Sequence, residues 1–346
     1  MSRPFKDVAL LARNRIKKSL REQLTVASAR TLEIKLSERG PDNMQLANPP
    51  HVVTEAIKKL FYFGDVKTVA SPDPDDGLPN APCKLFTLTS TTIDAAELSQ
   101  ILDVRIYLEQ VYYDHASRSR MTLQSPDTIG KCGERAARKA FQSAGGLIVA
   151  ENWGDIKDPR IIGASDGILY SNVLPVKNAM ILVEIKNQRE WIYHDAPVLW
   201  KHIKNSYNMN AIPLFVARRI YRSAFEYVLK RVGGLGLETR TQFAPPAFEE
   251  ALTDAKHAYG LDYFDLRFTD EPGPRLLNRT RALSKQIVIA RERMEQALPI
   301  VSPYVDILAD ENVRGNHRRK AYYSLQAALN KAKIEPISLV PEDYSQ

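Results

Sequence analysis

Apolar residues recur at helical spacing over three stretches near the start of the chain. The first, residues 1–24, gathers its apolar side chains near one face and keeps most of its basic side chains off that face. A second helix is predicted over residues 25–40. The third is predicted over residues 48–64, with Asn48 as the N-cap, prolines in the first turn and Gly64 as the stop.

Two strand-like runs follow the third helix. DVKTVAS at residues 65–71 and CKLFTLTS at residues 83–90 flank a tip rich in proline, aspartate and glycine. Three helices and a two-stranded wing resemble a winged helix-turn-helix domain. That resemblance implies that residues 49–63 form a recognition helix.

The charges of this module leave its partner open. Lys58 and Lys59 are the cations of the third helix and the expected nucleic-acid contacts. The tip of the wing carries Asp73, Asp75 and Asp76, which would repel a phosphate backbone. Contact with DNA and contact with another protein are therefore both retained as hypotheses.

The middle of the chain alternates helices with apolar strands. We expect a connecting helix over residues 92–120 and then an ordered series. The series is a helix at 129–144, strands at 146–153, 161–172 and 179–188, a helix at 195–210 capped by Asp195, a strand at 211–220, a helix at 221–234 and a strand at 237–243. The strand at 211–220 is continuously apolar, which is typical of the interior of a parallel sheet. The order α-β-β-β-α-β predicts a mixed sheet in an α/β protein.

The chain becomes helical again beyond Pro245. The segment NHRRKAYYSLQAALNKAK contains no acidic residue, so Arg318, Arg319 and Lys320 would form a phosphate-facing patch. A solvated helix face is the alternative. A length of 346 residues fits two or three domains. We predict a winged-helix-like domain at 1–90, a connecting segment at 91–124, a core at 125–245 and a helical C-terminal region at 246–346.

Composition narrows the class of protein. The chain is 44% hydrophobic and 26% charged, which is typical of a globular protein. Its net charge of +7 favours an anionic partner such as nucleic acid. Cys83 and Cys132 lie far apart and fit a reducing compartment. No apolar run approaches the roughly 18 residues of a membrane span. We therefore expect a cytoplasmic protein without a membrane partner.

Candidate chemistry centres on one acid-x-Lys triplet. Such triplets occur five times in the chain, but only Glu184-Ile185-Lys186 lies in a β-branched apolar run. In a strand, Glu184 and Lys186 point to one face and Ile185 to the other. If the preceding hairpin bends around Pro175, Asp166 falls opposite Glu184. Two facing carboxylates are destabilising unless a cation lies between them, and oxygen ligands suit Mg²⁺.

This pattern resembles the PD-(D/E)xK (restriction-endonuclease-like) nuclease superfamily, whose core has the same αβββαβ order. The resemblance covers about residues 128–243, roughly a third of the chain. It implies that Asp166 and Glu184 bind the metal and that Lys186 orients or deprotonates the attacking water, or stabilises charge on the phosphate. It also implies catalytic positions at Glu134, on the first helix, and at Gln188. Ser165 stands where the family often has proline.

The resemblance implies a metal-dependent nuclease that uses Mg²⁺, with Mn²⁺ as the alternative ion. We expect an endonuclease acting on double-stranded DNA in restriction, defence or repair, with Lys201 and Lys204 on a phosphate path or on a solvated face. RNA as the substrate, and a homodimer that cuts both strands, remain open alternatives. The competing hypothesis is a non-catalytic DNA-binding regulator with an inactive nuclease-like scaffold.

Overall fold

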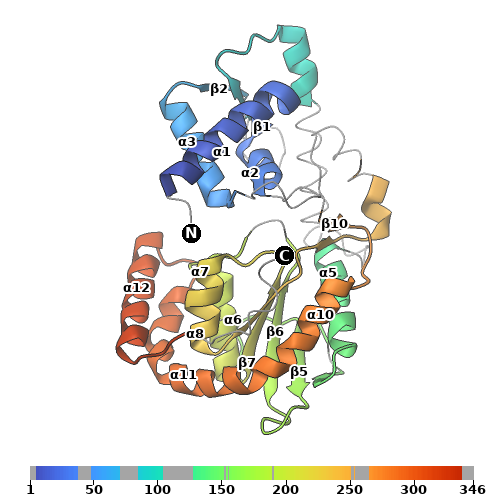
Figure 1. Cartoon of the computed structure of the whole chain (residues 1–346), viewed down its shortest axis with the longest axis vertical. Helices are drawn as coiled ribbons and strands as arrows, with labels where there is room; N and C mark the ends of the chain where they lie inside the picture. The colour runs from blue at the N-terminus through green and yellow to red at the C-terminus, as the bar shows by residue number, and fades with distance from the viewer. Residues whose placement is uncertain are drawn as a thin grey trace. The chain divides into compact units, whose positions relative to one another are not determined.

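A computed structural model describes most of the chain (Figure 1). The described residues are 5–37, 48–70, 85–103, 128–151, 153–154, 156–188, 191–250, 253 and 265–336. The chain divides into two compact units, and each is described below by itself. The first comprises Met1–Thr128 with Ala244–Phe268, and the second comprises Ile129–Phe243 with Thr269–Gln346.

The first unit combines helices with a small antiparallel sheet in the order β1-β3-β2. Its described elements are α1 (Phe5–Ser19), the π-helical turn η1 (Leu20–Leu24), β1 (Ala27–Ser28), α2 (Ala29–Ser37), α3 (Pro50–Tyr62), β2 (Val66–Ala70), β3 (Leu85–Leu88), a helix at 95–103, η3 (Pro246–Phe248) and β10 (Leu266–Arg267). Only the first third of the connecting helix expected at 92–120 is described. The tip of the wing, with its three aspartates, lies outside the described residues.

Helix α3 shows how the first unit closes its core. Its buried side chains, Val53, Ile57 and Leu60 among them, recur at spacings of three and four and pack with α1. The helix ends before Gly64, which has a φ of +69°. The predicted N-cap is wrong, because Pro49 occupies that position. Asn48 is buried, and its side-chain oxygen accepts a hydrogen bond from Arg15 of α1 instead.

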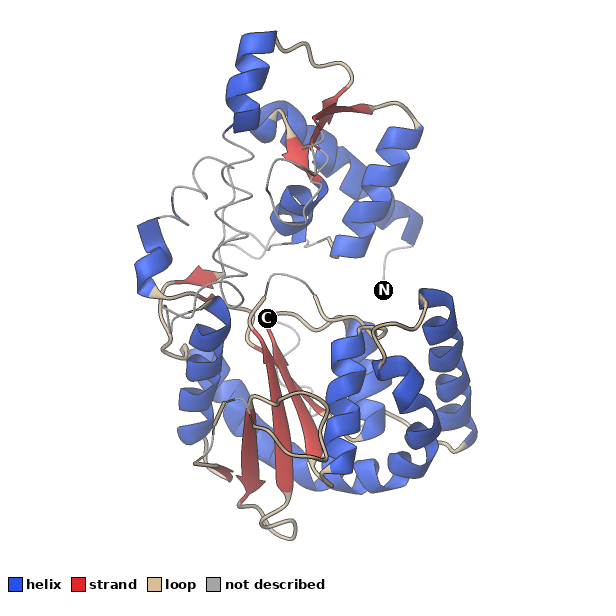
Figure 2. Ribbon diagram, turned by 180° about the vertical axis from the view of Figure 1, so that it is seen from behind, coloured by secondary structure: helices blue, strands red, loops and turns tan. Residues whose placement is uncertain are grey.

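The second unit is built on a five-stranded mixed sheet in the order β4-β5-β6-β7-β8 (Figure 2). Its elements are α5 (Ile129–Gln142), β4 (Leu147–Val149), β5 (Gly167–Ser171), β6 (Met180–Lys186), α6 (Pro197–Asn208), β7 (Ile212–Ala217), α7 (Arg222–Ala224), η2 (Phe225–Leu229), α8 (Lys230–Val232), β8 (Leu235–Glu238), β9 (Gln242–Phe243), α10 (Pro274–Leu283), η4 (Ser284–Gln286), α11 (Ile287–Ala309) and α12 (Gly315–Lys331). The pairs β4-β5 and β5-β6 are antiparallel, whereas β6-β7 and β7-β8 are parallel. The predicted α-β-β-β-α-β order and the mixed sheet are confirmed.

Two local predictions in this unit are wrong. Ala196 rather than Asp195 is the N-cap of α6, and it precedes Pro197. The last parallel strand runs over Leu235–Glu238 instead of residues 237–243. It stops short because Arg240 adopts a left-handed conformation, with a φ of +53°, which ends the extended run.

The helices after residue 269 share the hydrophobic core of the sheet. Arg231 connects α8 to α12 and to the residues that follow α12. Its Nε donates to the carbonyl of Ile334 at 2.8 Å, and its two Nη atoms donate to Gln326 and Asn330 at 2.7 Å each. Across the described part of the chain, no helix is both long enough and apolar enough to cross a membrane.

Candidate active site

The backbone fixes Asp166 at the start of β5. Its amide donates to the carbonyl of Val183 at 3.2 Å, and its carbonyl accepts from the amide of Gly154 at 2.8 Å. Its carboxylate oxygen Oδ2 accepts from the amide of Ile185 at 2.6 Å. The carboxylate is therefore aimed by β6, the strand that carries Glu184 and Lys186.

The hairpin has the predicted register as far as Gly167, which pairs with Val183, while Ile168 pairs with Leu182. Asp166 lies one residue before this ladder, and its amide donates to the carbonyl of Val183. Local contacts constrain the residues on either side of Asp166. The hydroxyl of the buried Ser165 donates to the carbonyl of Val183 at 2.8 Å, so the residue before Asp166 is hydrogen-bonded to β6.

Gly167 lies against the indole of Trp153, where a Cβ atom would come within 2.5 Å of a ring carbon. Real Cβ atoms do not approach other atoms this closely. Any larger residue would push Trp153 or the start of β5 out of position. The glycine after Asp166 therefore has a steric cause.

Glu184 and Lys186 form a close ion pair on one face of β6. Nζ of Lys186 lies 2.6 Å from Oε1 of Glu184, and their side chains are 28% and 13% exposed, respectively. This contact follows from strand geometry, since residues two apart in a strand project to the same face.

The electrostatics of the site favour an additional positive charge. Burial raises the pKa of Asp166 to about 7, and the facing carboxylate of Glu184 and the more distant Glu134 contribute to the rise. Lys186 and the amide of Ile185 act in the opposite direction. Burial alone would lower the pKa of Lys186, but the three carboxylates outweigh it and raise that pKa. All three carboxylates therefore act on the ammonium of Lys186.

Glu134 joins this cluster from α5. Its side chain is 15% exposed, and its Oε2 lies 2.8 Å from Nζ of Lys131, one turn earlier on the helix. Its charge acts on both Asp166 and Lys186, as the directions of their pKa shifts indicate. Gln188 is half-buried and lies in a bend two residues past the end of β6, so it does not continue the strand as predicted.

Asn187 has a positioning role that the sequence did not suggest. Its side-chain nitrogen donates to the carbonyl of Ile129 at 2.5 Å and to that of Phe243 at 2.6 Å, and its oxygen accepts from the amide of Phe243 at 3.0 Å. This attaches the end of β6 to the start of α5. Gly133 makes room for it, since a Cβ there would lie 2.3 Å from Cβ of Asn187.

The cluster has the donor chemistry of a magnesium site but a small ligand set. Asp166 and Glu184 supply carboxylate oxygens, which are the ligands that Mg²⁺ prefers, and Mg²⁺ commonly uses only one or two carboxylates. Within the described ranges, no three or more His, Cys, Asp or Glu side chains are grouped so that they could hold a metal ion. The raised pKa of Asp166 fits a site in which a cation would compensate the buried charge.

A second charged cluster lies at the carboxyl ends of the parallel strands. The amide of Arg218 lies 3.4 Å from the carbonyl of Lys186, and the Arg218 side chain is buried. Beyond it, Oε1 of Glu238 accepts from the amide of Ile220 at 3.0 Å, and Oε2 of Glu238 lies 3.2 Å from Nε of Arg240. These arginines were not singled out in the sequence, where each lies outside any recognisable motif.

The lysines of α6 make internal contacts. Lys204 forms an ion pair with Asp306 of α11 at 2.7 Å. Nζ of Lys201 approaches Gly163, since a Cβ on that glycine would lie 3.3 Å away. Lys201 thus lies beside the loop that leads to Asp166, whereas Lys204 is engaged with another helix.

The remaining predicted nucleic-acid contacts lie on two other helices. On α3, Lys58 pairs with Glu55 at 2.8 Å, and Lys59 is exposed. On α12, Arg318 donates to the carbonyls of Asp310 and Val313, at 2.7 and 3.0 Å, and so closes the end of α11. Its neighbours on α12 line an open hollow on the surface, formed by Asn316, Arg319, Lys320, Tyr323, Ser324 and Ala327.

No protein-family model, no curated protein and no solved structure matches this chain.

Proposed function

We propose that this chain is a metal-dependent nuclease that hydrolyses phosphodiester bonds in DNA. Its second unit would be a PD-(D/E)xK-type core, and its first unit a winged-helix-like module that selects or positions the nucleic acid. The observation that carries the proposal is the cluster of Asp166, Glu184 and Lys186, in which one carboxylate has a pKa raised to about 7. A structural ion pair would balance its charges, whereas this cluster has an excess of negative charge.

Asp166 and Glu184 would hold the Mg²⁺ ion, or Mn²⁺ in its place. When bound, such an ion polarises the phosphate and lowers the pKa of a coordinated water. Oδ2 of Asp166 accepts from the amide of Ile185, and the carboxylate held in this way would be a ligand of the ion. Glu184 contributes a second carboxylate from the adjacent strand.

Lys186 would act as a cation and hydrogen-bond donor. Its raised pKa keeps it protonated at neutral pH, which supports orienting the attacking water and stabilising charge on the phosphate. Removing a proton from water would require a neutral amine, so the general-base alternative has less support. Glu134 reinforces the negative potential from α5.

The first unit supports a role in recognition. Its first three α-helices and its antiparallel sheet would be those of a winged helix, and α3 exposes Lys58 and Lys59. The proposed partner is double-stranded DNA, with a homodimer as the form that would cut both strands.

A non-catalytic DNA-binding regulator is the second candidate. It is favoured by the absence, among the described residues, of a group of three metal-ligating side chains. An intact pair of carboxylates beside a lysine favours the nuclease, because an inactive scaffold has no reason to keep carboxylates whose charges repel each other.

Cleavage assays separate the two functions. The purified protein is incubated with plasmid, linear duplex, single-stranded DNA and RNA, in Mg²⁺, Mn²⁺ or EDTA. The nuclease predicts cleavage that requires the metal and disappears in Glu184→Gln. A protein that binds DNA but cuts none of these substrates with either metal would be the regulator.

A further inference from the structure

Three aromatic rings lie just beyond the strand that carries Glu184 and Lys186. The ring centroids of Tyr193 and Tyr221 are 5.2 Å apart, and those of Trp191 and Tyr221 are 6.2 Å apart. All three side chains are half-buried. We call this group the strand-end rings.

The backbone ties the strand-end rings to the candidate site. The amide of Arg218 lies 3.4 Å from the carbonyl of Lys186, and the carbonyl of Arg219 accepts from the amide of Ile192 at 3.1 Å. Arg218 and Arg219 are consecutive residues, so these two backbone contacts lie about 3.3 Å apart along the extended chain. The rings therefore lie within reach of nucleotides that flank a phosphodiester held at Lys186.

The rings face away from the core. Ile192 pairs with Ile220 in a parallel bridge, and both side chains are buried. Because neighbouring residues in extended chain alternate, the flanking Trp191, Tyr193 and Tyr221 lie on the opposite side. Within the described residues, the indole N–H of Trp191 is buried and lacks a hydrogen-bond partner.

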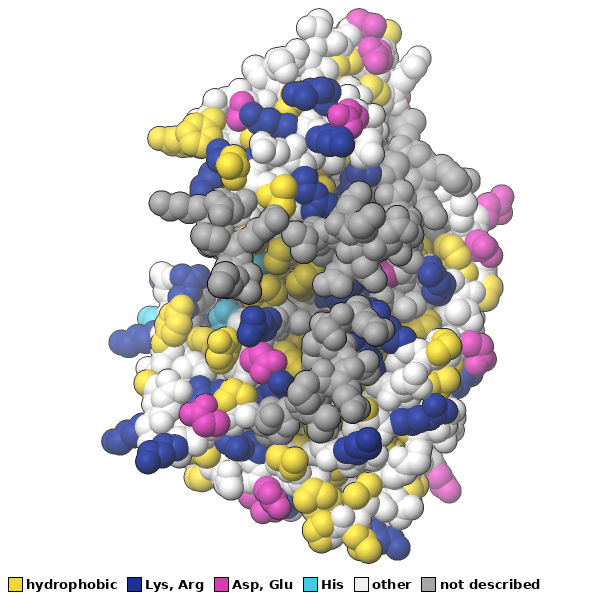
Figure 3. Space-filling model, viewed as in Figure 1, with side chains coloured by type: hydrophobic (Ala, Val, Ile, Leu, Met, Phe, Trp, Pro, Cys, Tyr) yellow, Lys and Arg dark blue, Asp and Glu magenta, His cyan; other side chains and the backbone are white. Residues whose placement is uncertain are grey.

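Basic side chains continue from this surface onto α12. Arg319 acts on the neighbouring His194, whose pKa is lowered first by burial and then by that charge, while Asp195 acts in the opposite direction. Arg319 and Lys320 are exposed and line the open hollow on α12. Figure 3 shows Lys and Arg side chains along the edge of the second unit where α12 runs in Figure 1.

We propose that the strand-end rings stack on unpaired bases of a single-stranded DNA segment next to the bond that is cut, and that Arg319 and Lys320 bind its phosphates. This rests on the proposed nuclease function and makes its substrate one with a single-stranded part. In a duplex the base faces are already stacked, so protein rings can use them only where the strands are separated. Stacking on any base also makes the contact tolerant of sequence.

Binding assays test the inference without cleavage. Fluorescence anisotropy in EDTA measures the affinity of the full-length protein for labelled single-stranded DNA and for duplex DNA. Tyr193→Leu and Tyr221→Leu should each weaken single-strand affinity about tenfold and leave duplex affinity unchanged. Tyr193→Phe and Tyr221→Phe keep the ring and should retain affinity. Tyr170→Leu is the matched control, because Tyr170 lies at the far end of β5 from Asp166.

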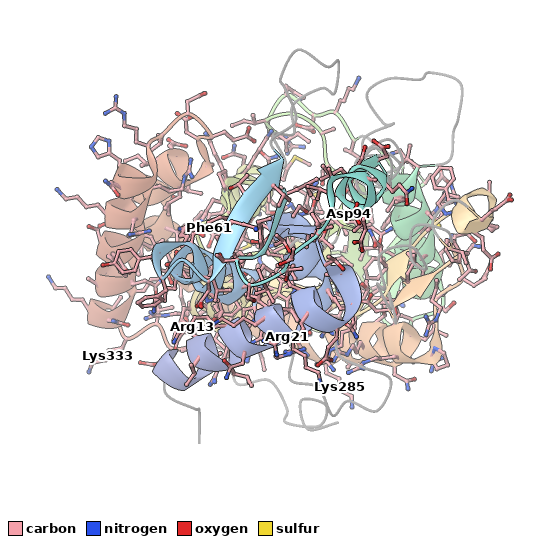
Figure 4. All side chains as sticks on the ribbon, turned by 90° about the horizontal axis from the view of Figure 1, so that it is seen from above. Arg13, Arg21, Phe61, Asp94, Lys285 and Lys333 are labelled. Atoms are coloured by element: carbon pink, nitrogen blue, oxygen red, sulfur yellow. The ribbon has the colours of Figure 1, made fainter. Side chains whose placement is uncertain are left out.

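The phosphate contacts have a separate signature. Arg319→Gln with Lys320→Gln should reduce the slope of log affinity against log salt by about 1.4, since each contact with a single strand contributes about 0.7. Lys285→Gln should leave the slope unchanged. Lys285 and Lys333, which follows α12, lie on well-separated sides of the molecule in Figure 4.

The outcomes distinguish the two proposals. Ring-dependent single-strand binding without any cleavage would support this surface and contradict the nuclease. Metal-dependent cleavage with single-strand affinity that is the same in the Leu variants and the parent would support the nuclease and overturn the role of the rings.

Discussion

A buried arginine and a half-buried aspartate in the second unit have opposite surroundings. Arg231, 4% exposed, donates to one carbonyl and two side-chain amides, all of them neutral acceptors. Asp166 accepts a hydrogen bond from one amide, and the carboxylates of Glu184 and Glu134 raise its pKa while Lys186 acts in the opposite direction. Arg231 is held by dipoles that match its donors, whereas Asp166 is held in an environment that disfavours its charge.

The difference separates a structural role from a functional one. A buried charge that connects two helices stabilises the fold only if each of its donors is satisfied. A carboxylate whose charged form is destabilised by burial gains stability when a cation binds to it.

The largest expected effect is on cleavage. Lys186→Met should reduce the cleavage rate by about 100-fold or more, because it removes a charge that stabilises the transition state, and should leave metal binding detectable by calorimetry. Glu184→Gln should remove both cleavage and metal binding. Lys285→Met is the control for loss of an exposed lysine. A Lys186→Met protein that cuts at the parental rate would rule out the assigned role.

The next effect is on stability and its pH dependence. The pKa of Asp166 is about 7 in the folded protein and near its ordinary value of 3.8 when unfolded. The folded state therefore binds this proton more tightly, and the free energy of unfolding falls as pH rises from about 4 to about 7. In EDTA at pH 8, Asp166→Asn should be more stable than the parent by about 4 kcal/mol, and the gain should vanish below pH 4.

Melting curves measure this gain. Added Mg²⁺ should raise the melting temperature of the parent and leave that of Asp166→Asn nearly unchanged, because only the parent binds the ion. Asp306→Asn is the control for loss of an exposed aspartate. A destabilised Asp166→Asn protein, with no effect of Mg²⁺ on either protein, would identify Asp166 as a structural residue.

The opposite effect is expected at Arg231. Arg231→Met should lower the free energy of unfolding by about 3 kcal/mol, since it removes three hydrogen bonds, one of them to the carbonyl of the buried Ile334. The decrease should be the same in EDTA and in Mg²⁺. Urea unfolding measures it, and Arg281→Met, at an exposed arginine, should change stability by less than about 0.5 kcal/mol. Equal stability of Arg231→Met and the parent would contradict the structural role assigned to Arg231.

The smallest effect is expected at exposed charges on α3. Lys59→Gln should weaken duplex DNA binding a few-fold and reduce the salt slope by about 0.9. Lys58→Gln should have a smaller effect, because Lys58 already pairs with Glu55 on its own helix. Anisotropy at several salt concentrations measures both. Unchanged slopes in both variants would favour a protein-contact role for this module.

The sequence predicted the parts of the fold that depend on local pattern. The alternation around Glu184 and the loop around Pro175 were sufficient to predict the hairpin register, in which Gly167 pairs with Val183. The continuous apolar run over Ile212–Ala217 was sufficient to predict a buried parallel strand. These features follow from side-chain periodicity, which is a local property of the chain.

Features that depend on distant contacts were missed. Asn48 has the right residue type for an N-cap, but Arg15, 33 residues away, binds its side chain. Asn187 follows the motif as an ordinary polar residue, and its role appears only when Ile129 and Phe243 lie beside it. The strand-end rings likewise require that Tyr221 come next to Trp191 and Tyr193.

The contact between Gly133 and Asn187 determines which residues a graft of this site into another protein would need. The same tripeptide occurs at Glu33–Lys35 in helix α2, where it has no strand partner to aim it. Grafting Glu-Ile-Lys into another sheet would therefore carry over the functional groups without their alignment. The portable unit includes the asparagine after the lysine and a facing helix with glycine at the crossing, where a Cβ would lie 2.3 Å from Asn187. A residue without any side chain thus belongs to the minimal specification of the site.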